Sequence, residues 1–264
     1  LAKLTGKQVY YDRPKRAVTA LFARRSPVGL MGTWLNVETG EWTDSTAHIG
    51  GGIDSYYEYL IKAWLLFGDR ECLEMWNTHI AAINTHLADT STGGLWYGQS
   101  EMVTGRRTGT RFGALEAFFP AVLCLAGDTA RAARLQESCY RMWALHGIEP
   151  EEIDYSTMEV TSPAYYLRPE IIESAYYLHQ VTGDERYRSM GRTFFRDLRK
   201  FCRTDAGYAH LKNIVTGEKA DAMESFFFAE TLKYLYLLFA PKGTIDFRST
   251  VFMTEAHPVR KTWD

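Results

Sequence analysis

The sequence lacks several features that mark common classes of protein. It has no apolar run of roughly eighteen residues, the length that a membrane-spanning helix needs, and no Asn-x-Ser/Thr acceptor for N-glycosylation. Its four cysteines form neither a Cys-x-x-Cys pair nor a Cys/His zinc pattern. Its formal net charge is −2 and its Lys and Arg residues are scattered, so the basic surface that nucleic acid requires is not expected. These absences predict a soluble, globular protein that does not bind nucleic acid, and they leave its compartment open.

What the sequence does have is a repeat of paired helices. An apolar, aromatic segment ends at a glycine four times, at Gly6, Gly68, Gly127 and Gly183, at intervals of 56 to 62 residues. Glycine is the usual residue just after a helix, and the Asp that follows three of these glycines can cap the next helix. The pattern predicts a helix, a tight turn and a second helix. Because residues 1–6 read as the tail of a helix, the chain is expected to begin inside an element.

The two helices of each pair differ in character. The first is unusually apolar, and we expect such helices over residues 53–67, 113–126, 170–182 and 223–239. The second is amphipathic, as over 186–203, where Arg188, Arg192, Arg196, Arg199 and Lys200 alternate with apolar residues. Inner and outer helices of an α/α toroid fit this difference. Segments 33–42, 96–106 and 208–218 each contain Thr-Gly and predict hairpins at the mouth where the inner helices begin.

The stretch from Leu167 to Ser174 carries the clearest candidate site. Pro169 is predicted as the first helical residue, because its missing N–H is one that the first turn leaves unbonded. Glu170 and Glu173 then lie in the opening turn on one face, where the helix dipole favours their charged forms. The apolar residues that follow predict a helix buried on nearly all sides, with two acids at its start.

Acids recur near the start of every predicted inner helix. Taken singly, each is more simply a residue that complements the helix dipole. Inner helices of a toroid run parallel, however, so we expect these acids to converge at one end of the axis among aromatic side chains. Carboxylates among aromatic rings suit a carbohydrate site, since acids bond hydroxyls and transfer protons while rings stack on sugar faces. The acids are Asp54, Glu58, Glu116, Glu170, Glu173, Glu224 and Glu230, and the aromatic residues are Tyr56, Tyr57, Phe118, Phe119, Phe226 and Phe227.

Four motifs in one order resemble the class I α-mannosidases, glycoside hydrolase family 47. This family includes endoplasmic-reticulum and Golgi α-1,2-mannosidases, mannosidase-like degradation-enhancing proteins and bacterial members. The motifs are Gly51-Gly52-Ile53-Asp54-Ser55-Tyr56-Tyr57-Glu58-Tyr59-Leu60, Leu167-Arg168-Pro169-Glu170 with Glu173-Ser174, Met223-Glu224-Ser225-Phe226-Phe227 with Glu230-Thr231-Leu232-Lys233-Tyr234, and Thr254-Glu255-Ala256-His257-Pro258.

The resemblance implies an all-α fold, an (α/α)7 barrel with small hairpins at its mouth, of which this chain would supply roughly four helix pairs. It implies one catalytic domain over residues 1–264 that lacks its N-terminal part. The implied activity is that of an inverting, Ca2+-dependent exo-α-1,2-mannosidase acting on mannose-containing oligosaccharides. The implied compartment is the lumen of the secretory pathway, or the periplasm or exterior of a bacterium.

The same resemblance assigns roles to residues. Glu170 resembles the general base that activates water, and Asp54 matches a second catalytic acid that acts on the leaving oxygen or orients the water. Thr254 matches the residue that gives its hydroxyl and carbonyl oxygens to Ca2+. The positions expected to hold the terminal mannose are Glu58, Arg168, Glu173, Phe226, Glu230 and Glu255.

The sequence also departs from the family pattern. Ala114 and Ala117 stand where the family has a histidine and a disulfide cysteine, and Gly52 stands where endoplasmic-reticulum enzymes carry a specificity arginine. The missing bridge fits a bacterial or degradation-enhancing member better than a Golgi enzyme. The family's Phe-Glu-x-x-Ile-Arg motif, with its general-acid glutamate, and its glycan-binding Glu-Phe-x-x-Leu motif do not occur in the chain. We therefore expect an N-terminal segment to accompany the chain when it is active.

Two other functions remain open. The first is a recognition protein that binds mannose at this site without cleaving the substrate. The absence of the general acid would leave a protein of this kind. An α/α-toroid sugar isomerase or epimerase is disfavoured, because such enzymes usually use histidines as proton carriers and no predicted inner helix begins with one.

Overall fold

Helices form the framework of the structure. A computed structural model describes residues 1–263. Among these residues, none of the helices has both the length and the apolar character needed to cross a bilayer. The α-helices are α1 (Ala2–Thr5), α2 (Val9–Phe22), α3 (Asp54–Phe67), α4 (Arg70–His86), α5 (Phe119–Leu125), α6 (Thr129–Ala144), α7 (Glu170–Thr182), α8 (Glu185–Phe201) and α9 (Leu232–Phe239). A 3-10 helix, η1 (Leu115–Phe118), precedes α5, and a π-helical turn, η2 (Phe227–Thr231), precedes α9.

The predicted helix junctions are confirmed. The four junction glycines all adopt the left-handed backbone that ends a helix, with φ between 70° and 87°. The aspartates after three of them accept a backbone N–H at the start of the next helix, as expected of caps. The helix tail predicted at the beginning of the chain is α1, which ends at Gly6.

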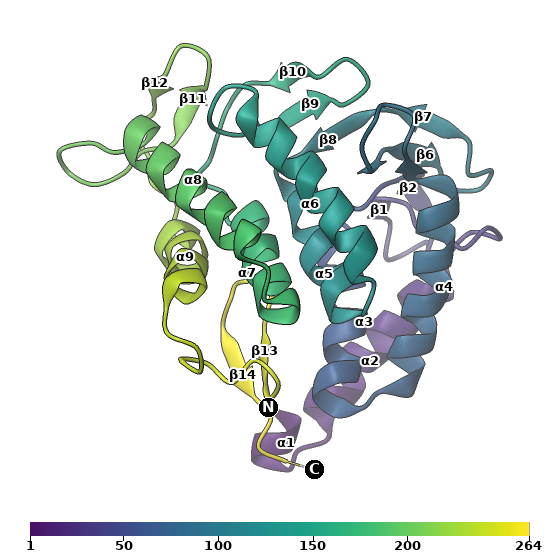
Figure 1. The fold of residues 1–264 in the computed structure, drawn as a ribbon. Helices are drawn as coiled ribbons and strands as arrows, with labels where there is room; N and C mark the ends of the chain where they lie inside the picture. Colours follow the sequence, from purple (N-terminus) through teal and green to yellow (C-terminus); the bar gives the residue numbers. More distant parts are fainter. Residues whose placement is uncertain (264) are drawn as a thin grey trace.

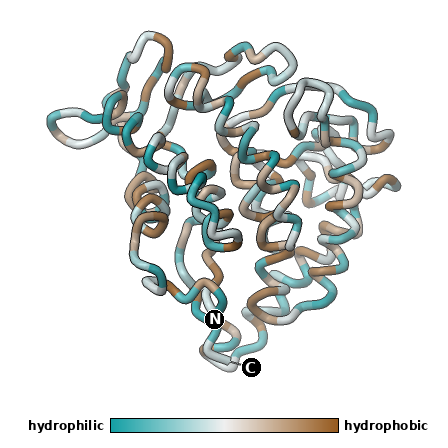
Figure 2. Tube along the Cα trace, in the orientation of Figure 1, coloured by the Kyte–Doolittle hydropathy of each residue, from teal (hydrophilic) through white to brown (hydrophobic). Residues whose placement is uncertain are grey.

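The helices form an inner and an outer layer. Helix α7 packs against α5 on one side, α9 on the other and α8 outside. Every side chain of α7 from Ile171 to Leu178 is buried, as the apolar pattern predicted. Helices α6 and α8 lie across the outside of α5 and α7 (Figure 1). One hydrophobic core runs through all these helices, and Figure 2 shows apolar stretches along them.

Short antiparallel strands stand at the two ends of the helix array. The pairs β1–β2, β6–β7 and β11–β12 confirm the predicted hairpins, and they lie with β8–β9–β10 at one end, whereas β13–β14 lies at the other (Figure 1). The strands are β1 (Trp34–Leu35), β2 (Trp42–Asp44), β3 (Thr46–Ala47), β4 (Ala88–Asp89), β5 (Trp96–Tyr97), β6 (Gln99–Glu101), β7 (Arg107–Gly109), β8 (Arg111–Gly113), β9 (Glu152–Asp154), β10 (Glu159–Ser162), β11 (Leu211–Asn213), β12 (Glu218–Lys219), β13 (Thr250–Phe252) and β14 (Pro258–Arg260).

Two inner helices begin later than predicted, because the residues before them bond to other segments of the chain. Gly113 pairs with Glu152 in the β8–β9 ladder, and the Ala114 N–H donates to the Glu151 carbonyl at 3.1 Å, so the helical turns start only at η1. The segment before η2 is tied to the β11–β12 hairpin by the bond from the His210 N–H to the Ala222 carbonyl at 3.0 Å. Pro169 is the cap of α7 rather than its first residue.

Ser174 joins α7 to the junction between η1 and α5. Its buried hydroxyl donates to the Ala117 carbonyl at 2.6 Å and accepts from the Ala121 N–H at 3.2 Å. These two backbone groups lie one helical turn apart, where the 3-10 geometry changes to α. The hydroxyl therefore fixes the position of η1 relative to the start of α7.

We predict that Ser174→Ala lowers the free energy of unfolding by about 1 to 3 kcal/mol, because it leaves a buried carbonyl and N–H without their partner. Urea unfolding followed by tryptophan fluorescence measures this change. Ser189→Ala on the exposed side of α8 is the matched control and should stay within about 0.5 kcal/mol of the parent chain. Equal effects of the two substitutions would contradict the bridging role.

Candidate active site

The starts of the inner helices converge on one small pocket, as predicted. Its volume is about 50 Å3, enough for a cation and a few water molecules. Acids from α3, α7 and η2 line it together with residues of η1 and of the turn between β13 and β14. The lining residues are Asp54, Glu58, Leu115, Phe118, Pro169, Glu170, Glu173, Glu230 and Thr254.

The turn that carries Thr254 comes from the opposite end of the helix array and is fixed at two points. The Thr254 N–H donates to the Tyr59 hydroxyl on α3 at 3.2 Å, and the Lys233 ammonium on α9 donates to the Ala256 carbonyl at 2.9 Å. Ala256 is buried and has a φ of 55°, an uncommon conformation for a residue with a side chain. The turn is therefore held beside the helix starts rather than left free.

The backbone before α7 is also held in an uncommon conformation. Leu167 has a φ of 61°, and its carbonyl accepts a hydrogen bond from the buried Thr231 hydroxyl at 2.6 Å. A strained residue of this kind persists only where its surroundings over-determine it. Thr231 thus connects η2 to the residues that direct Arg168 and Glu170 towards the site.

Arg168 is oriented by a partner that the sequence analysis missed. Its guanidinium makes a two-pronged ion pair with Glu151, with Nε–Oε1 and Nη2–Oε2 distances of 3.0 Å each. The same guanidinium lies over the Phe226 ring at 5.7 Å from the centroid. Glu151 stands in an irregular segment beside Pro150, with no periodic pattern to single it out. Its role becomes apparent only from its contact with Arg168 in the folded chain.

Burial dominates the electrostatics of the pocket. Removal from water raises the pKa of Glu170 to about 8, against the favourable charge of Arg168. Burial likewise raises the pKa of Glu173 to about 8, although the Tyr234 hydroxyl donates to its Oε1 at 2.9 Å. Burial and the nearby Glu255 raise the pKa of Glu230 to about 7. These carboxyls hold protons that exposed ones would release.

Glu58 is the acid of the pocket that has a cation as its direct partner. It forms a buried ion pair with Lys62, one turn further along α3. The sequence analysis did not single out Lys62, although its four-residue spacing from Glu58 is the spacing of helical ion pairs.

Glu116 lies behind the pocket rather than in its lining. Its carboxylate accepts from the Gly113 N–H at 3.0 Å, and burial raises its pKa to about 7. A side chain at Gly50 would place a Cβ 2.2 Å from the Glu116 Oε1, so glycine is required there. Burial also raises the pKa of Asp54, with Glu58 adding to the effect.

Several predicted residues lie outside the pocket lining. Glu224 faces the His210 ring, with a carboxylate oxygen 3.6 Å from Nδ1, and is not among the acids brought together. Glu255 is exposed beside the Thr254 turn, and Phe226 is half-buried next to Arg168. Conversely, Glu149 was missed: it is fully buried with no hydrogen-bond partner within residues 1–263, and burial raises its pKa well above the usual range.

The structure shows the surroundings of the residues that depart from the family pattern. The four cysteines are buried and free, so none of them forms a disulfide within the described chain. Gly52 has a φ of 99°, which an arginine at this position would find strained. In the part of the chain that the structure describes, no group of three or more His, Cys, Asp or Glu side chains is arranged to hold a metal ion.

The chain belongs to glycosyl hydrolase family 47, whose family model matches residues 1–261. It is 36% identical over 262 residues to alpha-mannosidase I MNS5 of Arabidopsis thaliana, covering 98% of this chain and 45% of that protein. It is 38% identical to human ER degradation-enhancing alpha-mannosidase-like protein 3, covering 97% of this chain and 28% of that protein.

The solved structure of the alpha-1,2-mannosidase from Trichoderma reesei confirms the predicted fold. It superposes with a TM-score of 0.88 at 28% identity, covering 98% of this chain and 63% of that chain. The chain therefore has the fold of a family 47 (α/α)7 barrel over the part that it spans. It spans less than half the length of the two sequence relatives named above.

The raised pKa values predict how stability depends on pH. Glu116, Glu170, Glu173 and Glu230 have folded pKa values of about 7 to 8, above the ordinary glutamate value of 4.5. Between about pH 6.5 and about pH 8 the folded chain therefore binds more protons than the unfolded chain. In EDTA, the free energy of unfolding should fall as pH rises through this window, as measured by urea unfolding.

Two histidines partly oppose this trend. Burial lowers the pKa of His48 and His79, so their unfolded forms bind more protons than their folded forms, most strongly below about pH 6.5. The four carboxyls outnumber these two histidines, so the decline remains. Glu173→Gln removes one of the titrating groups and should flatten the decline. A stability that is constant or rises between about pH 6.5 and about pH 8 would contradict the assignment.

Proposed function

We propose that the chain forms the C-terminal part of the single catalytic domain of an inverting, Ca2+-dependent exo-α-1,2-mannosidase. Its substrates would be high-mannose glycans or other α-1,2-mannosides. The observation that supports this proposal most is the convergence of carboxyls from three helical segments on a small, partly enclosed pocket that Thr254 also lines. The relatives named as α-mannosidases, which match nearly the whole chain, support it as well.

Glu170 is proposed as the general base. It stands in the first turn of α7, and its Oε2 has no hydrogen-bond partner within residues 1–263, so this oxygen can accept from the attacking water. A pKa of about 8 is suitable for a base, because a general base works best when its pKa lies near the working pH. Asp54, on a different helix, is proposed to act on the leaving oxygen or to orient the water. Inversion requires two carboxyls with room for a water between them.

The terminal mannose is proposed to be held by side chains around these two acids. Phe226 offers a ring for the sugar face, and Arg168, fixed by Glu151, offers N–H donors to hydroxyls. Carboxyls at Glu58, Glu173, Glu230 and Glu255 would accept hydrogen bonds from other hydroxyls. The buried pocket has room for only part of a sugar, which suits an enzyme that acts on a chain end.

Ca2+ is proposed to bind at Thr254, and the surroundings fit such an ion. Thr254 offers hydroxyl and carbonyl oxygens, the hard ligands that Ca2+ prefers, and the acids beside it provide negative charge within reach of bridging waters. A pocket without three clustered carboxylate ligands is consistent with an ion that keeps much of its shell as water and sugar hydroxyls. When bound, the ion would grip adjacent hydroxyls of the mannose and favour a distorted ring.

The upstream part of the family barrel is proposed to supply the general acid, since the chain spans 45% or less of the two sequence relatives named above. A second candidate follows from the same fact: without that acid the chain would recognise mannose glycans without cleaving them. No histidine lines the pocket within the described chain, which disfavours an isomerase. The lumen of the secretory pathway is the proposed compartment, with an exported bacterial protein as the alternative; one relative is named for the endoplasmic reticulum.

Proton NMR of α-1,2-mannobiose tests the proposal. With Ca2+ present and the upstream segment supplied, we expect release of β-mannose, the inverted anomer, which EDTA abolishes and added Ca2+ restores. The chain alone is expected to bind mannobiose only in Ca2+. Release of α-mannose would overturn the assignment, and so would binding and turnover that persist after EDTA removes Ca2+.

Two matched substitutions separate catalysis from binding. Glu170→Gln should reduce turnover by at least about a hundredfold, the usual contribution of a general base, while mannobiose still binds. Glu185→Gln, at the corresponding first position of α8 on the outside of the array, should leave turnover and mannobiose binding unchanged. Equal losses from the two substitutions would contradict the role of Glu170.

A further inference from the structure

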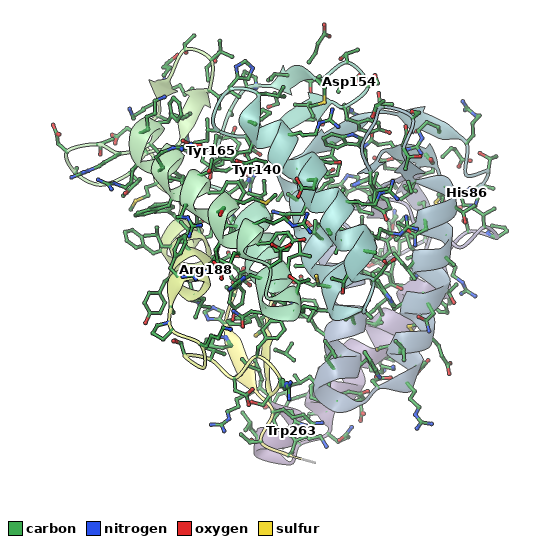
Figure 3. All side chains as sticks on the ribbon, viewed as in Figure 1. His86, Tyr140, Asp154, Tyr165, Arg188 and Trp263 are labelled. Atoms are coloured by element: carbon green, nitrogen blue, oxygen red, sulfur yellow. The ribbon has the colours of Figure 1, made fainter. Side chains whose placement is uncertain are left out.

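Trp34 is a large aromatic residue that the fold leaves in the open. It lies on β1, at the end of the helix array where most of the hairpins stand (Figure 1), and it is 61% exposed. Figure 3 labels Asp154 at this same end and Trp263 at the opposite end. The partner strand β2 carries a second tryptophan, Trp42, whose indole N–H donates to the Arg24 carbonyl at 2.9 Å. Trp42 therefore has a structural contact that accounts for its presence, whereas the exposed ring of Trp34 calls for another explanation.

The backbone that carries Trp34 is fixed although the side chain is exposed. Trp34 pairs with Asp44 in the β1–β2 ladder, and the neighbouring Thr33 N–H donates to the Asp44 carbonyl at 3.0 Å. The Thr43 hydroxyl donates to the Trp34 carbonyl at 3.1 Å. A ring on a paired strand is held in a defined position, which lowers the entropy that a ligand must lose with it on binding.

A histidine joins this hairpin to the residues that lead into α3. The Gly50 N–H donates to His48 Nδ1 at 3.1 Å, so in the neutral ring Nε2 carries the proton and donates to the Thr33 hydroxyl at 2.8 Å. The Thr33 hydroxyl in turn donates to the Thr46 carbonyl at 2.8 Å. This chain of hydrogen bonds fixes Trp34 relative to the segment before Asp54.

Bare backbone lies between Trp34 and the pocket. A Cβ at Gly51 would stand 2.8 Å from Cδ1 of Leu115, which lines the pocket, and a Cβ at Gly52 would stand 3.9 Å from the Trp34 ring. Gly52 is exposed and has a φ of 99°. Its Cα lies within about 7 Å of the Asp54 Cα, because two residues separate them. The Trp34 ring therefore stands at the rim of the pocket, with no side chain at Gly52 to cover it.

The size of the pocket indicates what this rim would meet. A volume of about 50 Å3 holds only part of a sugar, so the remainder of an oligosaccharide must lie outside the pocket. An indole offers a broad apolar face and an N–H donor, which match the C–H face and the hydroxyls of a sugar ring. A saccharide unit that leaves the pocket past Gly52 meets this face.

We propose that Trp34 is a specificity-determining residue that binds the saccharide unit next to the terminal mannose, with the C–H face of that unit stacked on the indole. The proposal rests on the proposed function, because it takes the terminal mannose to occupy the pocket. It implies that the chain prefers oligosaccharides to mannosides with a small aglycone, since only an oligosaccharide reaches the ring.

Calorimetric binding to the whole 264-residue chain in Ca2+ tests the proposal. Methyl α-mannoside fills only the terminal position, whereas α-1,2-mannobiose adds the next unit. Trp34→Ala should weaken mannobiose about tenfold and leave methyl α-mannoside unchanged, and Trp34→Phe should keep mannobiose within about threefold of the parent. Val37→Ala, at an 81% exposed residue in the turn of the same hairpin, is the matched control and should change neither sugar.

Acrylamide quenching of tryptophan fluorescence reads the contact directly. Mannobiose should protect one tryptophan of the parent chain from acrylamide, and this protection should be absent from the Trp34→Phe chain. Methyl α-mannoside should protect Trp34 in neither chain. A residue that only stabilises the hairpin would not give this pattern.

Three results would overturn the proposal and leave the proposed function standing. The first is mannobiose binding that Trp34→Ala leaves unchanged. The second is an equal loss of both sugars, which would assign Trp34 to the shape of the terminal pocket. The third is protection of Trp34 from acrylamide by the upstream segment without sugar, which would assign the ring to closure of the family barrel. Failure of the parent chain to bind either sugar in Ca2+ would instead contradict the proposed function, and the role of Trp34 with it.

Discussion

The burial of several acids in one place is the constraint on which the site depends. Acids at the starts of α3, α7 and η2 meet in a pocket of about 50 Å3, where few waters can screen them. An acid at the start of a helix is favourable, because the helix dipole is positive there. When the helices run parallel, however, these acids lie close together and their like charges repel. Three features reduce the repulsion between these acids. Some of the carboxyls bind protons, Glu58 forms a buried ion pair with Lys62, and the Tyr234 hydroxyl donates a hydrogen bond to Glu173. We propose that a hard cation at Thr254 would favour the ionised forms of these carboxyls.

The framework around the pocket explains how such a strained arrangement stays in place. Ser174 joins α7 to η1, Thr231 joins η2 to the backbone before α7, and Glu151 locks Arg168. Each of these groups connects elements that are far apart in the sequence. Together they fix the site from several directions, which a pocket needs if its acids are to act at defined positions.

The fold and the main acids were predictable from the sequence because their signals are local or periodic. Junction glycines, capping aspartates and apolar helices each follow from backbone and burial rules that act within a few residues. The late starts of α5 and α9 were missed because backbone bonds to residues distant in the sequence hold the segments before them. Glu151 was missed for a related reason, since only the folded chain shows that it pairs with Arg168.

We propose that Ca2+ binds at Thr254 and displaces protons from the buried carboxyls beside it. Calorimetric titration of Ca2+ in two buffers of different ionisation enthalpy counts the protons released per ion. We expect the release of roughly one or more protons near pH 7, declining to none above about pH 9, where the carboxyls are already ionised. Ca2+ binding without proton release near pH 7, or no binding of Ca2+ at any pH, would contradict it.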